Sequence, residues 1–408
     1  MKLRLTAAAM LSVVITTLVS AQEPANNAYA ITSESIGSSV WTEVKLINLT
    51  NGQVIKNVFE NSKANYNLFD ARSLKQITIA KNDSSSAMND LRPFAGYSAA
   101  CAFDKKKNRL YYAPLFINQL RYIDLNAATP SVYIFKDEKL SNAPDVEAEE
   151  YQVTRMVISS DGNGYALNNS GSHLVRFTTG ENPQISDLGE LNDAPENGDM
   201  KISDASTSWG GDMLADVSGY LYVISAHNQV FKIDVQTRTA TYLKKIKGLP
   251  EGFTTNGAVV DGDGNIIVSS ANSIISYYKV DPDVWEAKEI AAGNQVFNTS
   301  DLGNNNLLFE TNLAKRDDVF ITEKISVYPN PVKSKVFRVT FDNKEPGEYN
   351  VQLIDISGRI VSDKAVSVYR GAQVSEVRVN NNLTKGMYMV KVLNHLNREV
   401  YTRKIIFD

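Results

Sequence analysis

The chain has few cysteine and histidine residues, from which disulfides, metal sites and many catalytic sites are built. Its 408 residues include one cysteine and three histidines. A lone thiol excludes an intrachain disulfide, so the fold depends on packing and topology. The histidines do not have zinc-motif spacing, and no G-x-S-x-G nucleophile frame occurs. No stretch after residue 21 reaches 18 apolar residues, so no membrane-spanning segment is expected in the mature chain.

Positive charge is scarce in the first three quarters of the chain. The net charge is −4. Residues 22–322 carry 26 basic and 37 acidic side chains, a net −11, whereas residues 323–408 carry 14 and 9, a net +5. An acidic body argues against nucleic acid and anionic lipid as partners. The mild positive charge of the tail is evenly spread, and we interpret it as a solvated surface.

The N-terminus has the pattern of a secretory signal peptide. Lys2 and Arg4 precede the apolar run 7–19, and small residues follow it. This pattern predicts a cleaved segment 1–21, with the cut between Ala21 and Gln22. We therefore expect a protein that leaves the cytoplasm.

A weak repeat organises residues 22–322. Each copy has an apolar run, an Asp, a turn and a second apolar run, and a degenerate fifth copy lies at 299–311. The copies are AACAFDKKKNRLYYAP (99–114), RMVISSDGNGYALNNS (155–170), DMLADVSGYLYVISA (212–226) and GAVVDGDGNIIVSSA (257–271). The last three place Gly164, Gly219 and Gly264 three residues after the Asp. Asp opens a turn and Gly tolerates positive φ, so each copy predicts an antiparallel hairpin.

Further strands after three of these hairpins complete the pattern of a propeller blade. Four short antiparallel strands per repeat, without helical periodicity, are typical of β-propellers. The repeat spacing predicts about six blades over 22–322, with five or seven left open. Residues 40–56 resemble an outer strand pair only, so we expect 294–311 to supply the inner pair and close the ring by strand exchange.

The residues that could carry chemistry in this body are few. The channel mouth, where ligands of propellers usually bind, is expected to hold Arg155 and Asp212, with Trp209 just before. These three could bind a sugar or an acidic ligand, but a capping salt bridge with a packed indole is favoured. The DGDGN stretch (261–265) lacks the later ligands of a calcium loop, and we interpret it as a hairpin turn. Cys101, flanked by small apolar residues, is expected to be an inert core thiol.

Two histidines and two long insertions complete the candidate residues of the body. His173 and His227 lie in equivalent blade turns, without a pattern that selects a function. The acidic insertions 136–151 and 191–206 are long loops of the kind that often bind ligands.

After residue 322 the pattern changes to alternating strands separated by polar turns. Five such strands over about 85 residues predict a small Ig-like β-sandwich over 323–408. In 336–341, alternation places Phe337, Val339 and Phe341 toward its core. Pro329 and Pro331 cannot sit in a paired central strand, so they are expected to open the first strand.

Three motifs in order give this unit its identity. ISVYPNPVKSKVFRV, then VQLIDISGRIV (351–361) and LTKGMYMVKV (383–392) closely resemble the type A C-terminal sorting domain of type IX secretion cargo, a family of Bacteroidetes. The resemblance implies that the domain carries the chain across the outer membrane and is usually then removed. The motif residues are Tyr328, Pro329, Asn330, Pro331, Asp355, Gly358, Arg359, Gly386 and Tyr388.

Together these features predict an all-β protein, a propeller followed by a sandwich, that reaches the cell surface or medium through the periplasm. Its expected partners are the type IX secretion machinery and an extracellular glycan or protein. A binding module is favoured over an enzyme, and no cofactor is expected. The alternatives are a calcium-dependent, lactonase-like hydrolase, which six-bladed propellers also support, and a structural component of the cell-surface layer.

Overall fold

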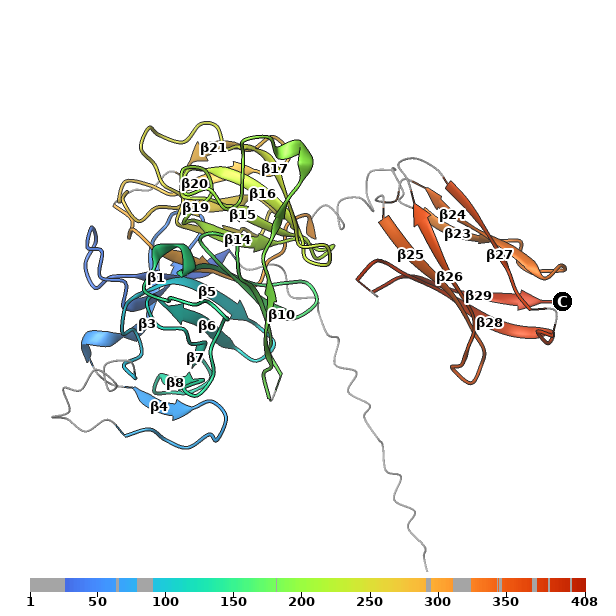
Figure 1. The fold of residues 1–408 in the computed structure, drawn as a ribbon, viewed down its shortest axis with the longest axis horizontal. Coiled ribbons are helices and arrows are strands. Elements are labelled where there is room, and N and C mark those ends of the chain that lie inside the picture. Colours follow the sequence, from blue (N-terminus) through green and yellow to red (C-terminus); the bar gives the residue numbers. More distant parts are fainter. Residues whose placement is uncertain are drawn as a thin grey trace, which may run out of the picture.

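A computed structural model describes residues 26–310, except 64–65, 79–90, 181 and 291–294, and residues 324–408, except 343, 345–346, 369–372, 381 and 397. The proposed signal peptide and its cleavage site, Ala21 and Gln22, lie outside the described residues. Figure 1 shows two all-β parts, a ring of sheets and a smaller sandwich. The prediction of a propeller followed by a sandwich is confirmed.

Within the described residues the ring consists of five sheets. The ring-closing sheet has the order β22-β1-β2-β3, and the next has the order β4-β8-β7-β6-β5. The bounds are β22 (Asp301–Gly303), β1 (Asn27–Thr32), β2 (Glu43–Asn48), β3 (Val54–Glu60), β4 (Asn67–Asp70), β5 (Ser98–Asp104), β6 (Arg109–Pro114), β7 (Arg121–Asp124) and β8 (Ser131–Ile134).

The other three sheets follow the same plan. Their orders are β12-β11-β10-β9, β13-β17-β16-β15-β14 and β18-β19-β20-β21. The bounds are β9 (Val153–Ile158), β10 (Asn163–Asn168), β11 (Leu174–Thr178), β12 (Ile185–Gly189), β13 (Asn192–Asp193), β14 (Asp212–Ala215), β15 (Leu221–Ile224), β16 (Gln229–Asp234), β17 (Thr239–Lys245), β18 (Gly257–Val260), β19 (Ile266–Ser269), β20 (Tyr278–Asp281) and β21 (Glu286–Glu289). Short 3₁₀ turns are η1 (Asn61–Lys63), η2 (Glu149–Tyr151) and η3 (Pro195–Asn197).

The innermost strands β22, β5, β9, β14 and β18 are neighbours in that order, and β18 returns to β22. The ring therefore closes with five blades rather than about six. Dividing the length by the average repeat spacing overestimates the number of blades. Long loops and the added edge strands β4 and β13 lengthen the chain without adding a blade. Ring closure by strand exchange is present, and β2 and β3 are the expected outer pair. Only β22 comes from the C-terminal side, because β1 supplies the second strand.

The repeat aspartates act at the hairpin turns as predicted. Asp216 Oδ1 accepts the N–H groups of Ser218 and Tyr220, each at 2.9 Å. Gly219 and Gly264 have positive φ, of 91° and 87°. In the second copy Gly162 takes this role, whereas Gly164 lies in β10, where a Cβ would collide with the Phe177 ring.

The ring has two distinct faces. The loop face carries the connections between blades and between second and third strands, and the described loops are 33–42, 71–78, 91–97, 115–120, 135–152, 169–173, 190–211, 225–228, 246–256, 270–277 and 295–300. The turn face carries the short hairpin turns, among them 159–162, 216–220 and 235–238. The two acidic insertions both belong to the loop face.

The C-terminal part is a sandwich of two sheets, β23-β24-β27 and β26-β25-β28-β29. Phe337, Val339 and Phe341 are fully buried in its core, as alternation predicts. The strands are β23 (Lys324–Tyr328), β24 (Val336–Asp342), β25 (Gly347–Ile354), β26 (Ile360–Val368), β27 (Gln373–Arg378), β28 (Gly386–Leu393) and β29 (Glu399–Phe407).

The turn between β28 and β29 touches the turn face of the propeller. Arg398 Nη1 donates to Ser160 Oγ at 2.6 Å and to the Val217 carbonyl at 3.4 Å. The His395 ring lies 5.5 Å from the Tyr220 ring. The sandwich therefore contacts the propeller on the side opposite the long loops.

Candidate functional site

The centre of the ring contains a pair of buried carboxyl groups. Asp212 on β14 and Asp301 on β22 are both fully buried, and their side chains are hydrogen-bonded to each other. Asp212 also accepts the N–H groups of Met213 and Ala258, each at 2.6 Å. Asp301 accepts those of Leu302 and Cys101. Each carboxyl group thus joins its own innermost strand to that of the next blade.

Burial determines how this pair ionises. Desolvation raises the pKa of Asp212 to about 7, against the opposing effect of its hydrogen bonds. Desolvation raises the pKa of Asp301 well above its usual range, and the Asp212 charge adds to the effect. Two adjacent buried carboxylates repel each other, so one proton is retained between them.

Arg155 on β9 is the third charged group of this cluster, and it is fully buried. Its guanidinium donates to the carbonyls of Gly210 at 3.0 Å, Asn168 at 3.0 Å and Ser208. Burial lowers the pKa of Arg155 to about 9, and the Asp212 charge partly opposes this. The predicted channel residues Arg155 and Asp212 therefore lie together, but their polar atoms are occupied by backbone groups.

Trp209 does not share this cluster through its side chain. The indole is half-buried and its Nε1 donates to the Ser203 carbonyl at 3.1 Å, within its own loop. The backbone on either side of it, at Ser208 and Gly210, binds Arg155 instead. The interpretation of Trp209 as a packed indole stays a prediction.

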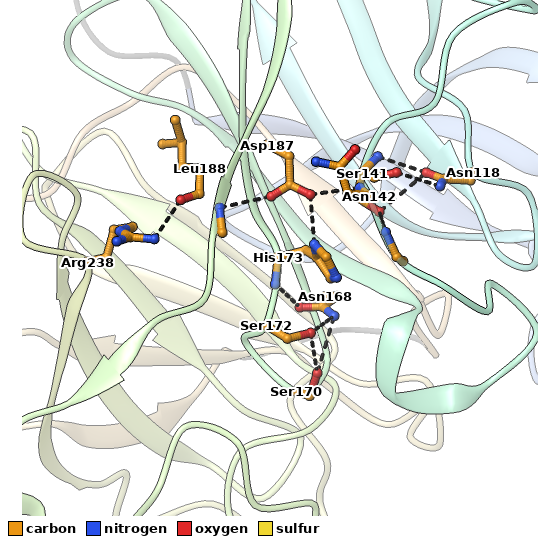
Figure 2. A network of polar contacts seen from close by, with 12 residues as sticks. Asn118, Ser141, Asn142, Asn168, Ser170, Ser172, His173, Asp187, Leu188 and Arg238 are labelled. Carbon is orange, nitrogen blue, oxygen red and sulfur yellow. Dashed lines mark hydrogen bonds and ion pairs between the residues drawn. The ribbon is translucent and has the colours of Figure 1, made fainter.

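A second polar cluster lies on the loop face of the third blade (Figure 2). His173 Nδ1 lies 2.7 Å from Asp187 Oδ2, and the Asp187 side chain is 7% exposed. The same carboxyl group accepts the N–H groups of Asn142 at 2.7 Å and Gly189 at 2.9 Å. Asn168 Oδ1 accepts the His173 N–H at 3.0 Å. Asp187 therefore orients the imidazole through Nδ1, and Asn168 holds the backbone of the same residue.

These contacts also determine which nitrogen of a neutral imidazole carries the proton. The Asp187 carboxylate accepts from Nδ1–H, and in a neutral imidazole with its proton on Nδ1 the lone pair lies on Nε2. Nε2 has no hydrogen-bond partner among the described residues. An oriented imidazole with a free acceptor can bind a hydroxyl group or accept a proton.

Sequence reasoning missed Asp301 and the pairing of His173 with Asp187. Asp301 could have been found from the sequence, because Asp212 and Asp301 each stand before an apolar residue at the start of an innermost strand. The pairing of His173 with Asp187 has no such sequence pattern, because Asp187 comes to lie beside β11 only when β12 pairs with β11 in the folded sheet.

The DGDGN turn does not present free carboxylates. Asp261 Oδ1 accepts the N–H groups of Asp263 and Asn265, and Lys279 Nζ lies 2.9 Å from Asp261 Oδ2. Among the described residues no group of three or more His, Cys, Asp or Glu side chains is arranged to hold a metal ion.

The later sorting motifs meet at one end of the sandwich. A cavity of about 470 Å³ is lined by the β25–β26 turn and by the segment that enters β28, including Asp355, Arg359, Gly386 and Tyr388. Hydrogen bonds from Ser357 and Arg359 lower the pKa of Asp355 to about 2, and Gly358 supplies the positive φ of 84° in this turn. Tyr388 donates to the Thr384 carbonyl at 2.9 Å.

The YPNP segment joins two strands rather than opening the first. Tyr328 ends β23, and β24 begins after it at Val336. The side chain of Asn330 donates to the Lys404 carbonyl and accepts the Ile406 N–H, each at 3.0 Å. The expectation that the prolines open the first strand is corrected, because 324–327 already pair with β24. This segment is bound to the last strand of the chain.

Helices offer no candidate for a membrane span in the described part of the chain, since none combines the necessary length and apolar character.

Comparisons with solved structures give only distant likenesses. PorZ, a surface component of the type IX secretion system of Porphyromonas gingivalis, is 13% identical with a TM-score of 0.31. The match covers 93% of this chain and 51% of the PorZ chain. Virginiamycin B lyase from Staphylococcus aureus is 11% identical with a TM-score of 0.30, and covers 75% and 83%. A putative gluconolactonase is 11% identical with a TM-score of 0.35, and covers 67% and 81%. The chain spans about half the length of the PorZ structure, and these low scores carry no conclusion on function.

No curated protein matches the chain. Residues 326–408 match the family model of the secretion system C-terminal sorting domain. That match covers YPNP, the Asp355 turn and the Gly386–Tyr388 segment, and it marks a protein delivered to the cell surface or the extracellular space. The chain is a type IX secretion cargo that carries a C-terminal sorting domain behind a β-propeller body.

Proposed function

We propose that the propeller is a binding module and that its loop face is the contact surface. The observation that carries this proposal is the state of the central charges. Arg155, Asp212 and Asp301 are buried and bonded to backbone groups of neighbouring blades. Buried side chains that bind the backbone of neighbouring blades stabilise the ring. A rigid ring holds its loops in fixed positions for a partner.

The position of the sorting domain supports the same surface. Its β28–β29 turn meets the propeller at Ser160 and Val217, on the turn face. Among the described residues the sandwich makes these contacts with the turn face, which leaves the loop face, with both acidic insertions, open to a partner. The cargo can therefore carry its sorting domain and present its loops at the same time.

A hydrolase is the second candidate, and one observation favours it. His173, oriented by Asp187, has the arrangement of an imidazole base with a free Nε2. A hydrolase would use it to activate water against a bound ester or lactone.

One protein preparation separates these candidates. Residues 22–408 are tested against a panel of soluble polysaccharides and outer-surface proteins, and also with ester and lactone substrates, with and without calcium. Two variants, Glu147→Cys on the loop face and Asp283→Cys on the turn face, are each coupled to a polyethylene glycol chain. Binding lost with the first and kept with the second supports the proposal. Steady turnover that is abolished in His173→Gln would replace it by the hydrolase.

A further inference from the structure

Two exposed aromatic residues flank the open end of the β5–β6 pair on the loop face. Tyr97 precedes β5 and is 42% exposed, and Phe116 follows β6 and is 52% exposed. The Leu115 N–H donates to the Tyr97 carbonyl at 3.0 Å. A Cβ placed on Gly96 would lie 3.8 Å from the Phe116 ring, so this ring lies beside the residue preceding Tyr97. The two aromatic residues therefore lie at one place on the surface.

Both residues have a backbone conformation that disfavours them. Their φ angles are 66° for Tyr97 and 62° for Phe116. Bulky side chains are outliers in this left-handed region, and such residues are concentrated at functional sites. The Phe116 N–H donates to Gln152 Oε1 at 2.7 Å, which holds the conformation in place. Folding alone would favour glycine at both positions, so we attribute the aromatic side chains to a role at the surface.

Polar groups continue this surface toward the third blade. Gln152, which holds Phe116, follows Tyr151, whose ring meets the His173 ring edge-on at 6.0 Å. His173 Nε2 has no hydrogen-bond partner in the described part of the chain, and Asn142, next to Asp187, exposes its side-chain amide (Figure 2). Apolar ring faces thus lie next to a free acceptor and to an amide that both donates and accepts.

The surrounding charge selects among ligands that such a surface could take. Asp145, Glu147, Glu149 and Glu150 are all exposed on the adjoining loop 135–152. Like charges disfavour an anionic ligand at this place. A neutral sugar chain has apolar C–H faces that pack on aromatic rings and hydroxyl groups that pair with an imidazole or an amide.

We propose that Tyr97, Phe116 and Tyr151, together with His173, form a binding site for a neutral carbohydrate chain. This inference rests on the proposed role of the loop face as a binding surface. It places recognition over the second and third blades, away from Trp209 and the filled channel. The aromatic residues would supply the platform, and His173 would accept a hydrogen bond from a sugar hydroxyl.

Affinity electrophoresis of residues 22–408 tests the proposal directly. The probes are a neutral β-glucan, xylan, mannan and α-glucan, with polygalacturonate as the anionic comparison. We expect retardation by at least one neutral polymer and none by the anionic one. The double variant Tyr97→Gly, Phe116→Gly should bind at least tenfold more weakly without a lower melting temperature, because glycine accepts both φ angles.

Two further variants test whether the loss of binding is specific to the proposed site. Leu74→Gly removes another exposed apolar residue with positive φ, 64% exposed and at 56°, and should leave binding unchanged. His173→Asn should weaken binding severalfold and keep the melting temperature, because its amide N–H can take the place of Nδ1 beside Asp187. Absence of binding to every neutral polymer, or equal binding by the double variant, overturns the inference. If a protein ligand then binds and is blocked by the label at Glu147→Cys, the proposed function stands while the carbohydrate site is rejected.

Discussion

Asp212 and Asp301 lie against each other at the centre of the propeller, each fully buried and each bonded to the first strand of the following blade. The two carboxyl groups retain a proton because burial disfavours the charged form of both. The innermost strands of neighbouring blades are therefore joined by side chains at points where no strand-to-strand ladder connects them.

Stability should fall as pH rises from about 4, where the carboxyl groups of the unfolded chain ionise, to the higher pH at which the folded pair loses its proton. In the unfolded chain both groups are ionised above about pH 4, whereas the folded state keeps Asp212 protonated up to about pH 7. The folded state binds more protons in this window, so the free energy of unfolding should decrease by about 1.4 kcal/mol per pH unit for one such group. Thermal melts between pH 4 and 8 measure this slope. Asp212→Asn should reduce it and the exposed Asp283→Asn should not; an identical slope in all three proteins would contradict the assignment.

Removing the Arg155 guanidinium should destabilise the propeller strongly. Arg155→Met leaves the carbonyls of Gly210, Asn168 and Ser208 buried without a donor. Loss of one partner from such a buried charged network costs about 3–5 kcal/mol. The matched change Arg176→Met, at an exposed position on β11, should cost about 0.5 kcal/mol or less. Denaturant unfolding of both variants checks the difference, and equal costs would show that the buried contacts contribute little.

Cys101 should be inert in the folded protein. Its side chain is fully buried, and burial raises the pKa of the thiol well above its usual range, with the nearby Asp301 charge adding to the effect. A thiol that is both inaccessible and protonated does not attack a disulfide reagent. Ellman's reagent at pH 8 should therefore detect no thiol in the native protein and one after unfolding. Rapid native labelling would contradict this burial.

Export should depend on the sorting domain. A chain that lacks residues 323–408 keeps the expected signal peptide and the propeller, but it loses the domain that matches the sorting family. We expect it to accumulate in the periplasm, whereas the full chain reaches the cell surface or the medium. Fractionation followed by immunoblotting measures both pools, and undiminished surface delivery of the truncated chain would refute the dependence.

The contact between the two parts can be trapped chemically. Ser160→Cys with Arg398→Cys replaces two residues whose side chains are hydrogen-bonded at 2.6 Å, and a short bismaleimide should link them within one chain. The pair Glu147→Cys with Arg398→Cys places one thiol on the opposite face and should not be linked. Equal yields for both pairs would mean that the sandwich does not reside on the turn face.

The sequence by itself determined the fold class and the route of export, because both depend on local patterns. Alternating apolar residues and Asp–Gly turns specify hairpins within about twenty residues, so the repeat was visible without any distant contact. YPNP, the Asp355 turn and the Gly386–Tyr388 segment are likewise contiguous motifs. Arg155 and Asp212 were expected at the channel because each lies at the start of the apolar run that precedes a repeat Asp, six residues before Asp161 and four before Asp216.

Only the tertiary structure decided the number of blades, the partners of the buried charges and the candidate binding surface. Ring closure pairs β22 with β1 across more than 270 residues of chain, and no local pattern encodes that pairing or the count of five. Asp212 meets Asp301, and His173 meets Asp187, because the sheets bring separate strands together. The left-handed backbone at Tyr97 and Phe116 has no signature in residue type, and at Phe116 it is held by a hydrogen bond to Gln152 of the neighbouring loop.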